Sequence, residues 1–112
     1  MSPETSGQTD FCIVLTTTAT EADAEALAQR VVLAGLGACV QVQRIKSFYL
    51  WKGEACADPE HLLLIKTRKA QYHRLEDFIR THHSYETPEI VQIPIEAGSD
   101  GYLEWVAANS VG

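Results

Sequence analysis

The sequence has few cysteines, few basic residues and no long hydrophobic run, and each shortage excludes a class of protein. Its three cysteines are odd in number and form no C-x-x-C pair, which excludes a disulfide framework and a zinc ribbon. Nine Lys and Arg residues are scattered among fifteen Asp and Glu residues, and the net charge of −6 argues against a nucleic-acid partner. No apolar run approaches the roughly 18 residues of a membrane-spanning helix, so we expect no membrane partner.

Catalytic and nucleotide-binding motifs are also missing. The chain contains no G-x-S-x-G, no Walker loop, no G-x-G-x-x-G and no H-E-x-x-H sequence. Cys39 and His83 could pair as nucleophile and base, but the sequence offers no obvious third group to orient them. We therefore expect a protein that is not an enzyme.

Length and composition indicate one domain. Residues 1–9 are rich in Ser, Thr, Gly and Pro and predict a disordered lead, and residues 10–112 form the single expected domain. The N-terminus lacks the basic start and apolar core of a signal peptide. Together with free thiols, which persist in a reducing compartment, this predicts a cytoplasmic location.

Hydrophobic periodicity divides the chain into four strands and three helices. Short apolar runs predict the strands, apolar residues at helical spacing predict the helices, and Thr20 suits an N-cap. We expect strands at residues 11–16, 38–51, 55–67 and 89–96, helices at residues 21–34 and 69–82, and a short helix that begins at Ser99 or Asp100.

The second expected strand changes phase. Val40 and Val42 alternate with glutamines, whereas Ile45 and Trp51 have the opposite parity. Because side chains alternate strictly between the two faces of a strand, this change predicts a bulge or a bend near residues 43–46.

The element order is β-α-β-β-α-β followed by a helix, which predicts an α+β, ferredoxin-like split βαβ fold with a long β-hairpin. Right-handed crossovers place both long helices on one face of the sheet. The other face and the aromatic hairpin tip, which includes Phe48 and Trp51, then stay exposed. Pairing of the hairpin with a neighbouring chain would cover them, so we expect a homo-oligomer.

Six segments together resemble the CutA family of divalent-cation tolerance proteins, in the order and spacing of that family. The resemblance implies a ferredoxin-like subunit in a PII-like homotrimer that assembles through its hairpins. It also implies a link to copper tolerance and divalent-cation binding, with no established reaction. The segments are GACVQV (37–42), SFYLWKGE (47–54), LLLIKTR (62–68), HSYETPEI (83–90), PIEAG (94–98) and YLEW (102–105).

Two positions depart from the family pattern. Ser84 stands where the family commonly has proline, and Thr16 stands where some members carry a cysteine proposed to bind copper. A thiolate is the preferred protein ligand of cuprous copper, so this chain lacks the soft ligand at that position. Imidazoles remain as ligands for a divalent ion, Cu²⁺ or Zn²⁺.

The candidate metal ligands are His82, His83 and Cys39. His82 falls on the apolar stripe of its helix and is interpreted either as a packed helix-end residue or as a ligand. His83 lies one position further on, in the turn, and is freer to bind an ion. Cys39 is either a packed strand thiol or a soft ligand that faces a cleft between subunits.

A second set of residues suggests a ligand cleft between subunits. Lys66 ends an apolar run and predicts either an ion pair with Glu86 or Glu89 or a site for a small anion. Tyr85 and Trp51 either close the trimer core or stack on a ligand. Two functions therefore stay open: a copper-binding tolerance protein, and a PII-like sensor or signalling adaptor for small molecules.

Overall fold

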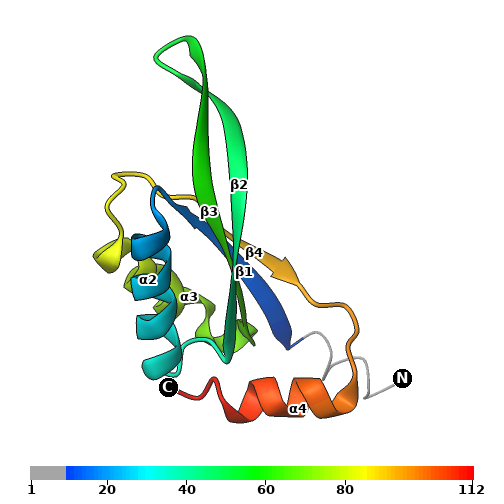
Figure 1. The fold of residues 1–112 in the computed structure, drawn as a ribbon. Helices are drawn as coiled ribbons and strands as arrows, with labels where there is room; N and C mark the ends of the chain where they lie inside the picture. The colour runs from blue at the N-terminus through cyan, green and yellow to red at the C-terminus, as the bar shows by residue number, and fades with distance from the viewer. Residues whose placement is uncertain (1–9) are drawn as a thin grey trace.

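The computed structural model describes residues 10–112, so the lead predicted for residues 1–9 lies outside the described part of the chain. The sheet is antiparallel with strand order β2-β3-β1-β4. The molecule extends to 50 Å along its longest axis, and the β2–β3 hairpin projects beyond the rest of it (Figure 1). The elements are β1 (Phe11–Thr18), α2 (Glu21–Leu33), β2 (Cys39–Trp51), β3 (Glu54–Arg68), η1 (Lys69–Gln71), α3 (Tyr72–His82), β4 (Ile90–Pro94) and α4 (Asp100–Ala108).

The predicted ferredoxin-like α+β fold is confirmed. β1 pairs with β3 on one side and with β4 on the other, and β2 pairs with β3 at the sheet edge. This order requires that each long helix crosses over the sheet between two strands that are not neighbours. Helices α2 and α3 lie together on one face, and α4 lies across one end of the sheet (Figure 1).

The main core lies between the sheet and helices α2 and α3. Helix α2 begins where Thr20 Oγ1 accepts a hydrogen bond of 3.0 Å from the Asp23 amide, so the predicted N-cap is confirmed. Burial of one apolar stripe from each helix against alternate strand residues excludes water and stabilises the fold. The buried residues of this core are Cys12, Val14, Ala24, Leu27, Val31, Leu36, Leu63, Ile65, Leu75 and Ile79.

Several element boundaries differ from the sequence prediction. Strand β1 continues two residues past Thr16, because Thr17 and Thr18 pair with the long strand β3. The second helix starts as a 3-10 turn over residues 69–71 and becomes α-helical at Tyr72. Strand β4 is shorter than predicted and ends at Pro94, whose ring leaves no N–H for the ladder.

The predicted bulge in residues 43–46 is wrong. The register is regular from the Cys39–Lys66 pair to the Trp51–Glu54 pair. Val40 packs against the core on the helix face, and the helices end before the hairpin does. The parity of the apolar residues therefore changes without an inserted residue: Val40 lies on the helix face, and Ile45, the ladder partner of Glu60, lies on the opposite, open face.

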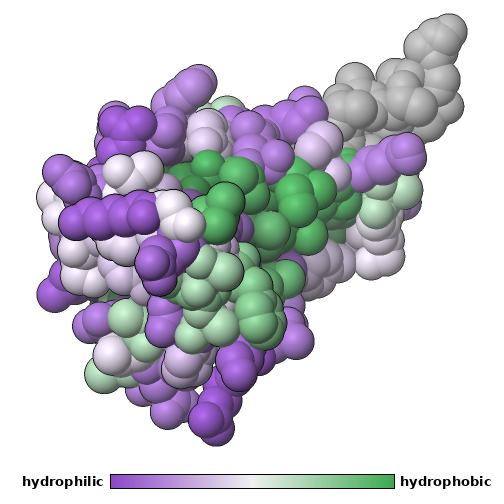
Figure 2. Space-filling model, turned by 90° about the horizontal axis from the view of Figure 1, so that it is seen from above, coloured by the Kyte–Doolittle hydropathy of each residue, from purple (hydrophilic) through white to green (hydrophobic). Residues whose placement is uncertain are grey.

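The sheet face opposite α2 and α3 carries apolar side chains without a helix over it. Seen from above, hydrophobic residues form a continuous band across the molecule (Figure 2). Exposed large hydrophobic residues include Val91 and Ile93 on this open face and Phe48, Tyr49, Leu50 and Trp51 in the hairpin. Among residues 10–112, no helix has the length and hydrophobicity to cross a membrane.

Candidate functional site

A large cavity lies between the hairpin and the turn that follows α3. Its volume is about 730 Å³, within the range of small-molecule sites. The hairpin supplies four aromatic or polar side chains from β2 and one carboxylate from β3, and most of the others come from the turn. The lining residues are Thr17, Ser47, Phe48, Tyr49, Trp51, Glu60, Tyr85, Glu86, Thr87 and Glu89.

Glu60 connects the hairpin to the turn. Its Oε2 accepts a hydrogen bond of 2.7 Å from the Tyr85 hydroxyl, and its Oε1 accepts one of 2.7 Å from the Ser47 hydroxyl. Hydrogen bonds to a carboxylate are about twice as strong as neutral ones, so Glu60 fixes the wall of the cavity. Further along the hairpin, the Tyr49 hydroxyl donates to Asp58.

These contacts perturb both tyrosines. Burial and the hydrogen bond to Glu60 raise the pKa of Tyr85 to about 12. The hydrogen bond to Asp58 raises the pKa of Tyr49 to about 12. Both phenols therefore remain neutral hydrogen-bond donors toward carboxylates throughout the physiological pH range.

We expect Tyr85→Phe to flatten the alkaline loss of stability. The unfolded phenol ionises near pH 10 and the folded one near 12, so the contribution of Tyr85 is complete below pH 10 and is lost as pH rises toward 12. Urea unfolding at several pH values from 9 to about 11.5 measures this decline. Tyr49 keeps its own decline in the variant, and equal slopes in the two proteins would remove Tyr85 as a cause.

The structure brings four of the five residues of the predicted ligand cleft into this cavity: Trp51, Tyr85, Glu86 and Glu89. The carboxylates of Glu86 and Glu89 are exposed and make no hydrogen bond or ion pair with any residue of the described part of the chain. Glu86 and Glu89 therefore place two unpaired negative charges at the edge of the cavity.

Lys66 does not line this cavity, and within the described residues it forms no ion pair with Glu86 or Glu89. The Lys66 ammonium donates to the Gln41 side chain across the β2–β3 pair. By strand alternation it shares the open face with Cys39, its direct partner in the ladder. The apolar run suggested that the Lys66 ammonium group is buried at a cost in free energy. The side chain is only half-buried, so this cost does not arise.

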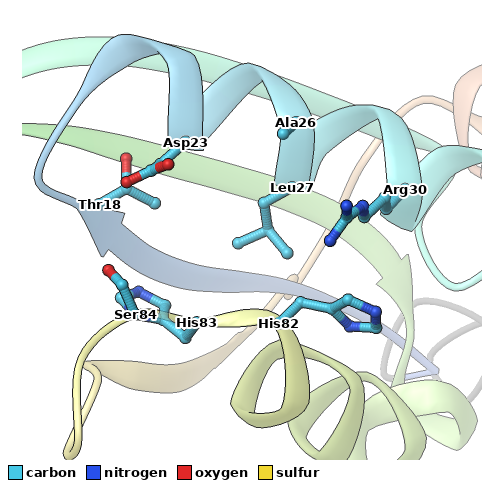
Figure 3. A pocket seen from close by; sticks show the side chains of 8 residues that line it. All are labelled: Thr18, Asp23, Ala26, Leu27, Arg30, His82, His83 and Ser84. Atoms are coloured by element: carbon cyan, nitrogen blue, oxygen red, sulfur yellow. The ribbon is translucent and has the colours of Figure 1, made fainter.

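A smaller cavity of about 170 Å³ lies between α2 and the end of α3. Figure 3 shows Arg30 and His82 pointing toward each other at one end, with His83 and Ser84 at the other. Arg30 forms no ion pair with any of residues 10–112.

The two adjacent histidines have different surroundings. Nε2 of His83 lies 2.6 Å from the Thr17 carbonyl oxygen, and Nδ1 accepts a hydrogen bond of 3.0 Å from the Tyr85 amide. A carbonyl oxygen only accepts, so Nε2 carries the proton and both nitrogens of the neutral ring are engaged. Nδ1 of His82 lies 2.9 Å from the Phe78 carbonyl oxygen, which leaves Nε2 of His82 free.

Cys39 lies apart from the histidines. It pairs with Lys66, which in turn pairs with Ile13 near the start of β1, whereas His83 contacts Thr17 near its end. Thr16, at the position of the family's cysteine, is fully buried, and its Oγ1 has no hydrogen-bond partner among the described residues. Among residues 10–112, no three His, Cys, Asp or Glu side chains are grouped closely enough to hold a metal ion.

Sequence reasoning missed Glu60, Ser47 and Arg30. Glu60 and Ser47 lie on the two strands of the hairpin, and only the folded structure shows that Ser47 contacts Glu60 and that Glu60 contacts Tyr85. Ser47 opens one of the family-like segments, but a hydroxyl in a strand carries no distinctive signal. Arg30 lies on the polar side of α2, where arginine is ordinary.

Comparison with known proteins gives consistent matches. Residues 12–109 match the family described as CutA1 divalent ion tolerance protein. The chloroplastic protein CutA of Arabidopsis thaliana is 43% identical over 81 residues, which cover 71% of this chain and 44% of that protein. The chain thus spans less than half the length of this curated relative.

Solved structures agree in both fold and length. The divalent cation tolerance protein Cut A1 of Thermus thermophilus has a TM-score of 0.86 and 37% identity, and the match covers 89% of this chain and 98% of that one. The protein described as the periplasmic divalent cation tolerance protein CutA of Archaeoglobus fulgidus has a TM-score of 0.84 and 35% identity, covering 86% and 94%.

Proposed function

The chain belongs to the CutA1 divalent ion tolerance protein family, and from this premise we propose that it is a cytoplasmic homotrimer that binds a divalent cation, Cu²⁺ or Zn²⁺, without catalysing a reaction. The three cysteines form no disulfide bond. Free thiols stay reduced in a reducing compartment, and this supports the cytoplasmic location.

His82 is the proposed principal ligand. The observation that carries this choice is that Nδ1 of His82 is held by the Phe78 carbonyl oxygen, so the lone pair of Nε2 is available. An ion at His83 would have to displace the Tyr85 amide from Nδ1. His83 and Cys39 are therefore secondary candidates, and Cys39 binds separately if it binds at all.

The fit of one subunit to a metal ion is partial. The described residues supply no group of three ligands, and Arg30, which lines the same cavity as His82, repels a cation. Water or a ligand from another subunit would complete the coordination. This predicts weak binding, because few protein ligands fix the ion.

We expect His82→Ala to remove most Cu²⁺ binding, and His83→Ala to leave most of it. His83→Ala should instead lower stability, because it breaks the contacts with Thr17 and Tyr85. Calorimetric titration with Cu²⁺ and thermal unfolding separate the two effects. Arg30→Gln is a matched test and should tighten binding, since it removes the nearby positive charge. Unchanged Cu²⁺ affinity in His82→Ala would exclude this assignment.

The open sheet face and the hairpin support the trimer. Strand β2 is an edge strand, and its outer backbone groups have no partner within the sheet of the described chain. Phe48 and Leu50 are each 76% exposed and Trp51 is 61% exposed. Contact with neighbouring copies would bury this apolar surface, which is larger than monomers usually leave in water.

A second candidate function is PII-like sensing of a small molecule. The 730 Å³ cavity that gathers Trp51, Tyr85, Glu86 and Glu89 favours it. In this alternative the cavity forms part of a cleft between subunits. A partner protein recognises the ligand-bound state, and no reaction is catalysed. Calorimetry or thermal unfolding with metals and with metabolites distinguishes the two functions, because stabilisation by a metabolite alone favours the sensor.

A further inference from the structure

The charge of the large cavity indicates which ligands it would accept. Three carboxylates line it, from Glu60, Glu86 and Glu89, and no Lys, Arg or His side chain of the described residues does. Glu60 is engaged by two hydroxyl donors, but Glu86 and Glu89 are without partners in the described part of the chain. All the charged side chains that line the cavity are negative, so the lining itself repels an anion and attracts a cation.

The aromatic lining indicates the kind of cation. Four aromatic rings share the cavity with the carboxylates, and the face of such a ring attracts ammonium groups within about 6 Å. Two of these rings already have an ammonium group of this chain in range: Lys46 Nζ lies 5.8 Å from the Phe48 ring, and Lys52 Nζ lies 5.8 Å from the Trp51 ring. A bare metal ion would gain little from such walls, because it prefers several oxygen or nitrogen ligands.

We propose that this cavity binds a small organic ammonium ion, with Glu86 and Glu89 pairing with its charge and Trp51 and Tyr85 contacting its carbon chain. The proposal rests on the second candidate function, the small-molecule sensor, and names its ligand class. It differs from the small anion that the sequence suggested, because Lys66 lies outside the cavity. Glu60 positions the Tyr85 ring, since its two oxygens already accept hydrogen bonds from the Ser47 and Tyr85 hydroxyls.

The test uses the full chain, as it assembles in solution, and 1,4-diaminobutane as the probe. Succinate has the same carbon length with opposite charge, and 1,4-butanediol is its neutral counterpart. Calorimetry should show saturable binding of the diamine, and weaker or no binding of the other two. Binding should weaken as salt is raised, because the charged edge of the cavity is exposed.

Variants locate the binding. Glu86→Gln/Glu89→Gln should weaken diamine binding at least about tenfold, since each lost carboxylate removes a charged hydrogen bond. The control Glu25→Gln/Glu104→Gln removes the same charge from exposed positions outside the cavity and should change binding less than about twofold. Lys46→Met/Lys52→Met should tighten binding, because it frees two rings and removes two like charges.

Three results would overturn the proposal: no saturable binding at millimolar diamine, tighter binding of succinate than of the diamine, or an equal loss in the two glutamine pairs. Light scattering on every variant checks that the assembly is intact. Cu²⁺ titration of Glu86→Gln/Glu89→Gln is expected to match the parent chain, so failure of the amine site is distinguishable from failure of the metal or trimer proposals.

Discussion

If the protein is the trimer that we propose, of about 37 kDa from three chains of 12.4 kDa, replacing the outer hairpin, residues 46–59, by Asn-Gly is expected to give a monomer. The removed segment carries the exposed aromatic tip, and with it the surface that we propose for contact with neighbouring copies. Multi-angle light scattering at micromolar concentration measures the mass directly.

The shortened chain should still fold. Ile45 and Glu60 are direct partners in the ladder, so a two-residue turn between them keeps the register. The native tip is itself such a turn, with positive φ at Lys52 (52°) and Gly53 (79°), the conformation that Asn-Gly favours. Circular dichroism checks the fold, since the helix-face core is untouched. A folded shortened chain that remains trimeric would show that the open sheet face alone is enough for assembly.

Leu63→Ala is expected to lower the free energy of unfolding by about 2 to 5 kcal/mol. Leu63 is fully buried in the core between the sheet and the helices, and its truncation leaves a cavity that the surrounding side chains fill only in part. Denaturant unfolding at a fixed chain concentration measures the loss, since assembly makes stability depend on concentration.

Leu64→Ala is the matched control for Leu63→Ala, because it removes the same atoms from the adjacent residue. Leu64 lies on the open face and is half-buried in the described chain, so when both substitutions are made in the shortened chain, which we expect to be a monomer, the truncation of Leu64 should cost less than half as much. An equal loss in the two variants would contradict this expectation and would mean that a second chain covers the open face as closely as α2 and α3 cover the other.

The fold was predictable because local patterns and topology agree. Apolar residues at helical spacing and the order of strands and helices were enough to specify a split βαβ plan with both helices on one face. The bulge prediction failed for a physical reason. The strand stays regular, and its apolar residues move from the helix face at Val40 to the open face at Ile45, so a change of parity alone does not indicate an inserted residue.

The candidate site was predictable only where its residues lie close in sequence. Tyr85, Glu86 and Glu89 share one turn, and they gather at one cavity with Trp51. Glu60 was missed because its role depends on the Tyr85 hydroxyl, 25 residues away. Lys66 was misplaced because an apolar run does not reveal that its strand neighbour Gln41 offers an acceptor. The different surroundings of His82 and His83 follow from backbone contacts that no spacing rule contains.

The Glu60 contacts give the hairpin the mechanics of a lever with a fixed pivot. From the Ile45–Glu60 pair to the tip the arm extends about 20 Å, at about 3.4 Å for each of the six further residue pairs. A rotation of about 5° at the pivot therefore moves the tip by about 2 Å, more than half the spacing of adjacent residues along a strand. A small displacement of Tyr85 or Ser47 at the pivot would therefore become a larger displacement of the hairpin tip, where a neighbouring chain would contact the tip.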